Sequence, residues 1–247
     1  MVFSLKLYSK HWSSWYTVVL RKPGKPNYGI PKAYRPIALL NTIGKLLAAI
    51  VTEDIVFFTE KYSLLPANHF GGRPGRTTTD SMHLVVNRIK NVWRQHRVTV
   101  MLFLDIEGVF PNAVNDRLIH NMRKRRVPEE YIMFVERMLQ NCCTKLKFDD
   151  YESEWVAIDN GIGQGDPLSM ILYLYYNTDL LDTATTKNQT AVTFVDDANL
   201  YAEGSTYEEA YNSISDMLIK LGGARDWTTT HNSRFEKSKF AILCFSR

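Results

Sequence analysis

The chain has 247 residues, of which 45% are hydrophobic and 23% are charged, and its net charge is +4 at pH 7. With 13 Gly, 9 Pro and 3 Cys, it is not a collagen, a disulfide scaffold or a disordered tail, because its apolar fraction can bury a substantial core. The length predicts one large domain or two closely packed lobes.

Basic and acidic residues are distributed unevenly along the chain. The first 52 positions hold eight basic residues and no acidic one, whereas the rest of the chain holds 22 basic and 26 acidic residues. A basic segment joined to an acidic one suggests a polyanion partner for the first and metal ions for the second. A solvated basic face explains the first pattern equally well.

The cysteines and the apolar runs bear on where the chain resides. Cys142, Cys143 and Cys244 form no Cys-x-x-Cys pair, so we expect reduced thiols and an intracellular location, in the cytoplasm and nucleus. The amino terminus does not read as a signal peptide. The most apolar later stretch, residues 170–176, is far shorter than the roughly 20 residues of a membrane span, and we expect no membrane association.

The amino-terminal half is predicted to contain two strands, two helices and a third strand. The first strands cover residues 15–20 and 34–40 and are joined by a loop rich in Lys, Gly and Pro. Two apolar stripes at helical spacing follow, formed by Ile43, Leu47, Ile50 and Phe58, with Asp54 interrupting, and by Met82, Val85, Val86, Ile89 and Trp93. The nearly all-apolar run 98–104 then predicts a strand buried on both faces, and Asp105 ends it.

The carboxyl-terminal half is predicted to contain two hairpins, three helices and a last strand. The hairpins pair residues 145–148 with 155–158 and residues 191–195 with 198–202. A Gly-rich loop, residues 161–167, precedes the second helix. The first helix begins near Pro128, and the other two cover residues 168–181 and 207–221. The last strand covers residues 240–245.

Three aspartates lie at the ends of these predicted strands. Asp105 ends the buried strand, and Asp196 and Asp197 lie at the tip of the second hairpin. Burying carboxylates is costly unless cations neutralise them. If the strands are neighbours, the three side chains can hold two divalent cations, and oxygen ligands favour Mg²⁺ or Mn²⁺ over zinc. For the Asp-Asp pair taken alone, a polar turn is the alternative.

Six segments, in order along the chain, resemble the reverse transcriptases of non-LTR (LINE-type) retrotransposons. The segments are KPGK (22–25), YRPIALL (34–40), FGGRPGRT (70–77), FLDIEGVF (103–110), GIGQGDPLS (161–169) and FVDD (194–197). The resemblance implies an α+β fold, the fingers and palm of a right-hand polymerase, with an antiparallel palm sheet packed on helices. It assigns residues 1–97 and 112–157 to the fingers and residues 98–111 and 158–247 to the palm.

The resemblance also implies a role for individual residues. The catalytic residues would be Asp105, Asp196, Asp197 and Lys237, with Lys239 as an alternative lysine. Two Mg²⁺ or Mn²⁺ ions would be held by Asp105, the Ile106 carbonyl, Asp196 and Asp197. The substrate-binding residues would be Lys22, Lys25, Arg35, Phe110, Gln164 and Gly165. The nucleic-acid-binding residues would be Arg73, Arg76, Arg123, Lys124, Arg125 and Arg126.

Phe110 is the implied selector of deoxynucleotides, because a bulky ring against the sugar excludes a 2′-hydroxyl. The alternative for this residue is a core aromatic. Two positions depart from the family, which usually has Ala where Val109 stands and Pro where Gly163 stands. A thumb is expected after the palm and is absent before the chain ends at Arg247, so we expect a fragment of a longer element or a degenerate remnant.

The implied function is RNA-directed DNA synthesis, in which a primer 3′-hydroxyl attacks the α-phosphate of a dNTP on an RNA template. The expected partners are therefore an RNA template, a DNA primer and dNTP. One alternative is a non-catalytic nucleic-acid-binding remnant of a retroelement. Another is an RNA-dependent RNA polymerase, against which Phe110 argues.

Overall fold

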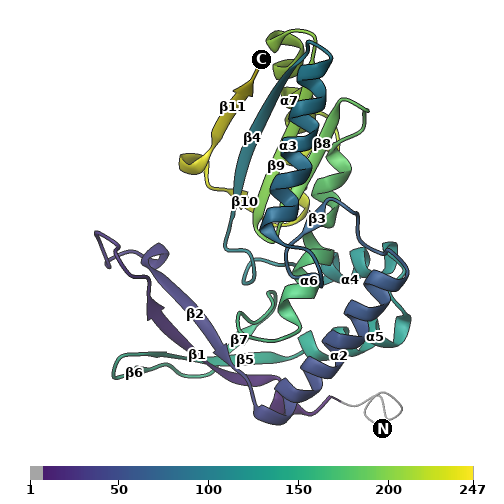
Figure 1. Ribbon diagram of the computed structural model, residues 1–247. Coiled ribbons are helices and arrows are strands. Elements are labelled where there is room, and N and C mark those ends of the chain that lie inside the picture. Colours follow the sequence, from purple (N-terminus) through teal and green to yellow (C-terminus); the bar gives the residue numbers. More distant parts are fainter. Residues whose placement is uncertain (1–7, 247) are drawn as a thin grey trace. The chain divides into compact units, whose positions relative to one another are not determined.

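The computed structural model describes residues 8–246, and the chain divides into two compact units (Figure 1). Unit 1 comprises Met1–Phe58 and Phe110–Leu172, and unit 2 comprises Thr59–Val109 and Tyr173–Arg247. Each unit is therefore assembled from two separate stretches of chain. The breaks between units differ from those expected between fingers and palm, and the assignment of segments to fingers and palm stays a prediction.

Unit 1 contains a five-stranded sheet in the order β2-β1-β5-β6, with β7 also paired to β5. The strands are β1 (Ser14–Arg21), β2 (Tyr34–Leu39), β5 (Cys142–Phe148), β6 (Tyr151–Glu152) and β7 (Val156–Ile158). The two predicted strands before residue 41 are confirmed, and they pair with each other in antiparallel fashion. The predicted hairpin is also confirmed, because β5 pairs with β7 and, further along, with β6. The parallel pairing of β1 with β5 was not predicted.

Three helices belong mainly to unit 1, and a fourth, short helix contains the break between the two units at Leu172. They are α2 (Thr42–Lys61), α4 (Asn115–Lys124), α5 (Glu129–Leu139) and α6 (Ser169–Asn177). The helix expected near Pro128 is confirmed as α5, which starts at the next residue. Sequence reasoning missed α4, whose apolar residues Leu118 and Met122 are fully buried.

The buried face of α2 is not the predicted one. Ile43 and Ile50 are exposed, whereas Ala48, Val51 and Ile55 are buried. Apolar residues lie on several faces of this helix, so helical spacing alone does not identify the face that is buried. In α3 (Thr78–Arg94) the predicted stripe is partly right, because Ile89 is buried but Met82 is 65% exposed.

Unit 2 is built on a six-stranded sheet in the order β10-β4-β9-β8-β3, with β11 also paired to β4. The strands are β3 (His69–Phe70), β4 (Val98–Glu107), β8 (Gln189–Phe194), β9 (Asp197–Gly204), β10 (Arg234–Phe235) and β11 (Ala241–Phe245). All pairings are antiparallel except that of β3 with β8. The expected antiparallel sheet is thus confirmed, with one short parallel strand at its edge.

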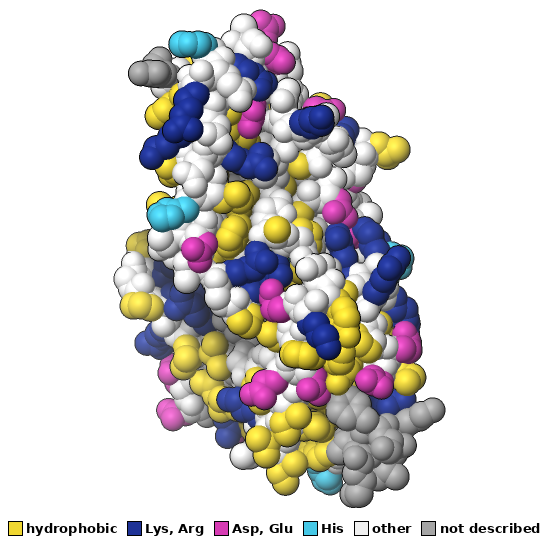
Figure 2. All heavy atoms as spheres, turned by 45° about the vertical axis from the view of Figure 1, so that its right-hand side comes forward, with side chains coloured by type: hydrophobic (Ala, Val, Ile, Leu, Met, Phe, Trp, Pro, Cys, Tyr) yellow, Lys and Arg dark blue, Asp and Glu magenta, His cyan; other side chains and the backbone are white. Residues whose placement is uncertain are grey.

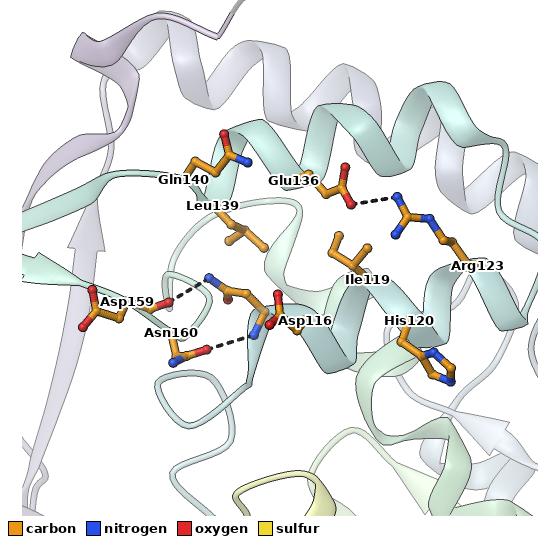
Figure 3. A pocket seen from close by; sticks show the side chains of 10 residues that line it. Asp116, Ile119, His120, Arg123, Glu136, Leu139, Gln140, Asp159 and Asn160 are labelled. Carbon is orange, nitrogen blue, oxygen red and sulfur yellow. Dashed lines mark hydrogen bonds and ion pairs between the residues drawn. The ribbon is translucent and has the colours of Figure 1, made fainter.

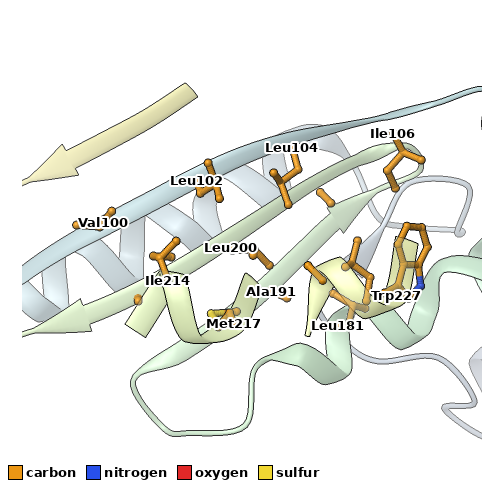
Figure 4. Packing of buried hydrophobic residues seen from close by; sticks show 14 of the residues in the cluster. Val100, Leu102, Leu104, Ile106, Leu181, Ala191, Leu200, Ile214, Met217 and Trp227 are labelled. Carbon is orange, nitrogen blue, oxygen red and sulfur yellow. The ribbon is translucent and has the colours of Figure 1, made fainter. Parts of the chain in front are cut away.

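The core of unit 2 explains why β4 is almost entirely apolar. Helix α7 (Tyr207–Ile219) presents Ile214 and Met217 to Leu102, Leu104 and Leu200 on the central strands (Figure 4). Helix α3 also contacts β4, so the strand is buried on both faces, as predicted. The remaining helical segments are α8 (Ala224–Thr230) and four 3₁₀ turns, η1 (Lys10–Trp12), η2 (Pro31–Ala33), η3 (Thr178–Thr183) and η4 (Lys237–Lys239).

The surface mixes all classes of side chain. On the face shown in Figure 2, Lys and Arg side chains lie among Asp and Glu side chains, and hydrophobic groups also reach the surface. Among residues 8–246, no helix has both the length and the apolar character needed to cross a membrane.

Because α7 packs on the sheet, substitutions of two isoleucines of this helix should differ greatly in their effect on the free energy of unfolding. Ile214 is 4% exposed and Ile219 is 66% exposed. We expect Ile214→Ala to lower the free energy of unfolding by about 2–4 kcal/mol, because it removes buried methyl groups and leaves a cavity. Ile219→Ala should change it by less than about 0.5 kcal/mol. Urea denaturation measures both, and equal effects would contradict the packing described.

Candidate active site

The three predicted catalytic aspartates lie together at one end of the unit 2 sheet. Strands β4 and β9 pair in a register that places Asp105 opposite Asp197. Strands β8 and β9 form a hairpin whose last pair is Phe194 with Asp197, so Val195 and Asp196 make the turn. Residues 91 positions apart in the sequence therefore meet at one sheet edge, as predicted.

The hairpin turn has an unfavourable backbone conformation that its surroundings support. Val195 has φ +57, in the left-handed region that β-branched residues rarely adopt. The Asn177 side chain donates a 2.6 Å hydrogen bond to the Val195 carbonyl. In turn, His69 Nε2 donates to Asn177 Oδ1 at 2.8 Å. Burial lowers the pKa of His69 to about 4, so the ring is neutral near pH 7 and adds no charge beneath the aspartates.

The segment before α3 packs directly against this turn. Gly71 has φ +66, and a Cβ there would lie 2.8 Å from Val195 Cγ2, so only glycine fits without movement. The Arg73 side chain is 2% exposed, forms a bidentate pair with Glu60 and donates to the carbonyls of Pro66 and His69. These bonds fix the loop on which His69 and Gly71 approach the acidic turn.

The electrostatics of the aspartates reflect their crowding. Asp196 and Asp197 reach solvent, yet partial burial raises the pKa of both. The charge of Asp105 raises the pKa of both further, and the charge of Asp196 adds to the effect on Asp197. Lys239 acts in the opposite direction, because its charge stabilises both carboxylates. The cluster therefore carries negative charge that only one nearby cation offsets within the described residues.

Lys239, not Lys237, contacts the aspartates. Lys239 Nζ donates to Asp105 Oδ2 at 2.8 Å, and no such ion pair is found for Lys237 in the described part of the chain. Sequence reasoning gave Lys237 as the catalytic lysine and Lys239 as the alternative. Both lysines lie in the turn η4, and only Lys239 contacts Asp105 in the described chain. A role in catalysis for either lysine stays a prediction.

A hollow of about 410 Å³ opens beside these residues in unit 2. It is lined by Asp105, Asp197 and Lys239, by apolar side chains of β4 and β8, by Asn199 of β9, and by hydroxyl and apolar side chains of the first turns of α3.

The donor set fits divalent cations in its chemistry. Carboxylate oxygens are the ligands that Mg²⁺ and Mn²⁺ prefer, and repulsion among Asp105, Asp196 and Asp197 is the kind of unfavourable energy that a cation relieves. Ile106, whose carbonyl was a predicted ligand, follows Asp105 on β4 and has a buried side chain. Across residues 8–246, no three His, Cys, Asp or Glu side chains already stand in a metal-binding cluster.

The predicted nucleotide-contacting residues gather in unit 1. The carbonyl of Gln164 accepts a 2.7 Å hydrogen bond from the amide of Ala38 on β2. Gly165 has φ +113, and a Cβ there would lie 2.9 Å from the Ala38 carbonyl. The Phe110 carbonyl accepts from the amide of Ile162. The 161–167 loop is thus fixed between β2, the strand that carries Arg35, and Phe110.

The predicted triphosphate-binding cations differ in their surroundings. Lys22 follows β1, and its Nζ donates to the Lys32 carbonyl at 3.0 Å. Lys25 and Arg35 are exposed, and neither has an acidic partner within the residues that the structure describes. Lys25 and Arg35 therefore have side chains available to an anion, which is what the prediction requires.

The residues predicted to contact nucleic acid differ in their burial and in their partners. Arg73 differs most from expectation, since a residue that contacts nucleic acid must be accessible, whereas Arg73 is buried and paired with Glu60. Arg76 lies over the Phe70 ring and donates to the Ala67 carbonyl. Arg123 pairs with Glu129 and Glu136 at 3.0 and 2.7 Å. The remaining predicted contacts, Lys124, Arg125 and Arg126, end α4 or follow it, and whether any of these residues binds nucleic acid stays a prediction.

Another hollow, of about 590 Å³, lies between α4, α5 and the 159–160 segment of unit 1 (Figure 3). Its lining mixes acidic, basic and amide side chains, and the Arg123–Glu136 pair lies on its rim. It contains none of the predicted catalytic residues, so we assign no chemistry to it.

Comparison with known proteins agrees with this geometry. A family profile described as reverse transcriptase (RNA-dependent DNA polymerase) matches residues 20–243. The chain belongs to the reverse transcriptase family.

Individual relatives indicate which group of reverse transcriptases the chain resembles. A probable RNA-directed DNA polymerase from transposon X-element of Drosophila melanogaster is 26% identical over 99% of this chain. The RNA-directed DNA polymerase from mobile element jockey of the same species is 25% identical over 99% of it. These likenesses support the predicted non-LTR, LINE-type retrotransposon origin. The chain spans about 27% of the length of each of these relatives.

Solved structures show the same fold at low sequence identity. A Candida tropicalis apo telomerase truncated from its C-terminal domain matches with a TM-score of 0.64 and 11% identity, over 98% of this chain and 52% of that one. A Candida albicans telomerase in complex with an RNA fragment matches with a TM-score of 0.62 and 11% identity, over 96% of this chain and 44% of that one. The predicted α+β polymerase fold of fingers and palm is thereby supported.

Sequence reasoning missed the polar residues beneath the acidic turn. His69 and Asn177 carry no catalytic pattern, and they become neighbours of the turn only through the β3–β8 pairing and α6. Glu60 likewise gave no signal, and it contributes by holding Arg73. One signal was present, because Asn177 ends a helix whose preceding residues are mostly apolar. A polar side chain in such a place needs a hydrogen-bond partner.

Burial of Arg73 yields a test of its structural role. We expect Arg73→Met to lower the free energy of unfolding by about 3 kcal/mol, because it leaves Glu60 and two carbonyls without their donor. Arg225→Met, at an exposed position of α8, should cost less than about 0.5 kcal/mol. Urea denaturation provides the comparison. A negligible cost for Arg73→Met combined with weaker RNA binding would instead favour a template contact.

Proposed function

We propose that the chain is the polymerase portion of a retrotransposon reverse transcriptase, which transfers a nucleotide from dNTP to a primer 3′-hydroxyl on an RNA template. The observation that carries this proposal is the β4–β9 register, which sets Asp105 opposite Asp197 next to Asp196. Family membership and the names of the related transposon polymerases support it.

Asp105, Asp196 and Asp197 would hold the divalent cations of the reaction. When bound there, two such ions, Mg²⁺ or Mn²⁺, would supply the positive charge that activates a hydroxyl and stabilises a leaving oxygen. The sheet of unit 2 keeps the three carboxylates at one edge, and the Asn177 hydrogen bond holds the turn that carries Asp196. These residues thereby orient the reacting groups, which is a main part of catalysis in phosphoryl transfer.

Residues of unit 1 would bind the nucleotide. Arg35 and Lys25, exposed and without acidic partners in the described chain, would contact the triphosphate. The Gln164–Gly165 backbone would approach the nucleotide and template, and Phe110 would exclude a 2′-hydroxyl. The free thiols of Cys142, Cys143 and Cys244 suit the proposed location in the cytoplasm and nucleus.

Removing the charge at the hairpin turn tests the site. We expect Asp196→Asn combined with Asp197→Asn to abolish Mn²⁺- or Mg²⁺-dependent dTTP incorporation on poly(rA)/oligo(dT), because two of the three carboxylates are lost. Asp150→Asn, an exposed aspartate of unit 1, should incorporate as the unchanged chain does. Incorporation at the normal rate by the double variant would remove this site assignment. No incorporation by the unchanged chain, with salt-sensitive RNA binding retained, would favour a non-catalytic remnant.

Phe110 should determine the sugar that is accepted. We expect Phe110→Ala to reduce the preference for dTTP over UTP by about tenfold or more, since the ring no longer blocks the 2′-hydroxyl. Phe57→Ala, at an exposed position of α2, should leave the preference unchanged. The ratio of kcat/KM for the two nucleotides measures the effect. A preference for UTP in the unchanged chain would instead indicate an RNA-dependent RNA polymerase.

A further inference from the structure

An irregular segment of the unit 2 sheet lies opposite Asp105. Strand β10 pairs Phe235 with Ile106, and β11 resumes the pairing with Ala241 opposite Phe103. Residues 236–240 therefore face only residues 104–105 of β4 and must leave the plane of the sheet. A bulge of this kind redirects side chains and is a common device next to active sites.

Hydrogen bonds within the bulge give it a fixed shape. The amide of Glu236 donates to the Asp105 carbonyl at 2.9 Å, and the amide of Lys239 donates to the Glu236 carbonyl at 2.9 Å. The Ser238 hydroxyl donates to the Glu236 carboxylate at 2.8 Å. The resulting turn η4 directs Lys239 to the Asp105 side chain, where Nζ and Oδ2 are 2.8 Å apart. The same turn gives Lys237 no comparable contact among the described residues.

The Lys239–Asp105 ion pair is exposed enough for another cation to replace the ammonium. The Lys239 side chain is 60% exposed and that of Asp105 is 24% exposed, and ion pairs so open to water contribute little to stability. An ammonium so exposed to solvent is charged at neutral pH.

We propose that Lys239 is a built-in counter-ion of the aspartate cluster, which a divalent cation displaces from Asp105. This proposal rests on the proposed function, because it takes the three aspartates as the cation site. Without the cation, the ammonium offsets part of the repulsion among carboxylates that would otherwise strain the β8–β9 turn. A cation that takes Oδ2 of Asp105 must compete with the ammonium, so Lys239 lowers the apparent affinity for the cation.

Binding of Mn²⁺ to the 247-residue chain, without primer or nucleotide, tests the proposal. The electron spin resonance signal of free Mn²⁺ gives the dissociation constant for each variant. We expect Lys239→Gln to bind Mn²⁺ about three- to tenfold more tightly, because the competing charge is gone. Lys237→Gln removes the same charge two residues away and should change the affinity by less than twofold. Lys239→Arg retains the charge and should bind Mn²⁺ as the unchanged chain does.

A double-mutant cycle separates competition from a general effect of charge. In the Asp105→Asn background, Lys239→Gln should no longer tighten Mn²⁺ binding. Thermal unfolding without Mn²⁺ adds a second readout, in which Lys239→Gln should have a lower Tm than Lys237→Gln and a larger gain when Mn²⁺ is added.

Several outcomes would overturn the counter-ion assignment. They are equal tightening by Lys237→Gln and Lys239→Gln, weaker binding by Lys239→Gln, and persistence of the effect in the Asp105→Asn background. Primer extension is measured separately. Normal dTTP incorporation with unchanged Mn²⁺ affinity in Lys239→Gln would contradict the counter-ion alone, whereas tightened binding without incorporation by the unchanged chain would contradict the proposed function alone.

Discussion

The pairing register of β4 with β9 is the constraint on which the site depends. Side chains alternate between the two faces of a strand, so a shift of one residue would move every apolar side chain of β9 to the opposite face. The core prevents such a shift, because Leu102, Leu104 and Leu200 must remain packed with α7. Apolar packing thereby fixes the position of Asp197 opposite Asp105, although neither carboxylate contributes to that packing.

This arrangement brings together negative charges that oppose folding, and unit 2 compensates for them in two ways. From one side, the bulge between β10 and β11 directs an ammonium to Asp105. From beneath, neutral groups hold the turn, since His69 is uncharged near pH 7 and Asn177 supplies an amide. A charged histidine would also have attracted the carboxylates, but at the cost of a buried charge. The aspartates thus remain available to cations from the open side.

Local patterns in the sequence predicted the elements that carry the site, and they failed where distant segments determine the structure. The run 98–104 could be read as a buried strand because it is short, apolar and contains several β-branched residues. The Asp-Asp hairpin likewise followed from its flanking runs. The parallel pairing of β1 with β5 joins segments more than 120 residues apart, and no local signal specifies it. Arg73 was misjudged because its partner Glu60 lies on α2, outside the loop that carries the arginine.

The charge pattern of the sequence acquires a different meaning once the chain is folded. The basic first 52 positions suggested a polyanion partner or a solvated basic face, yet unit 1 also includes residues 110–172 with their many acids. Several of its cations pair with those acids, namely Arg21, Arg123, Lys145 and Lys147. Lys25 and Arg35 have no such partner in the described chain. Pairing within the unit therefore separates cations that are already neutralised from cations such as Lys25 and Arg35 that remain available to an anion, and net charge alone would not have distinguished the two groups.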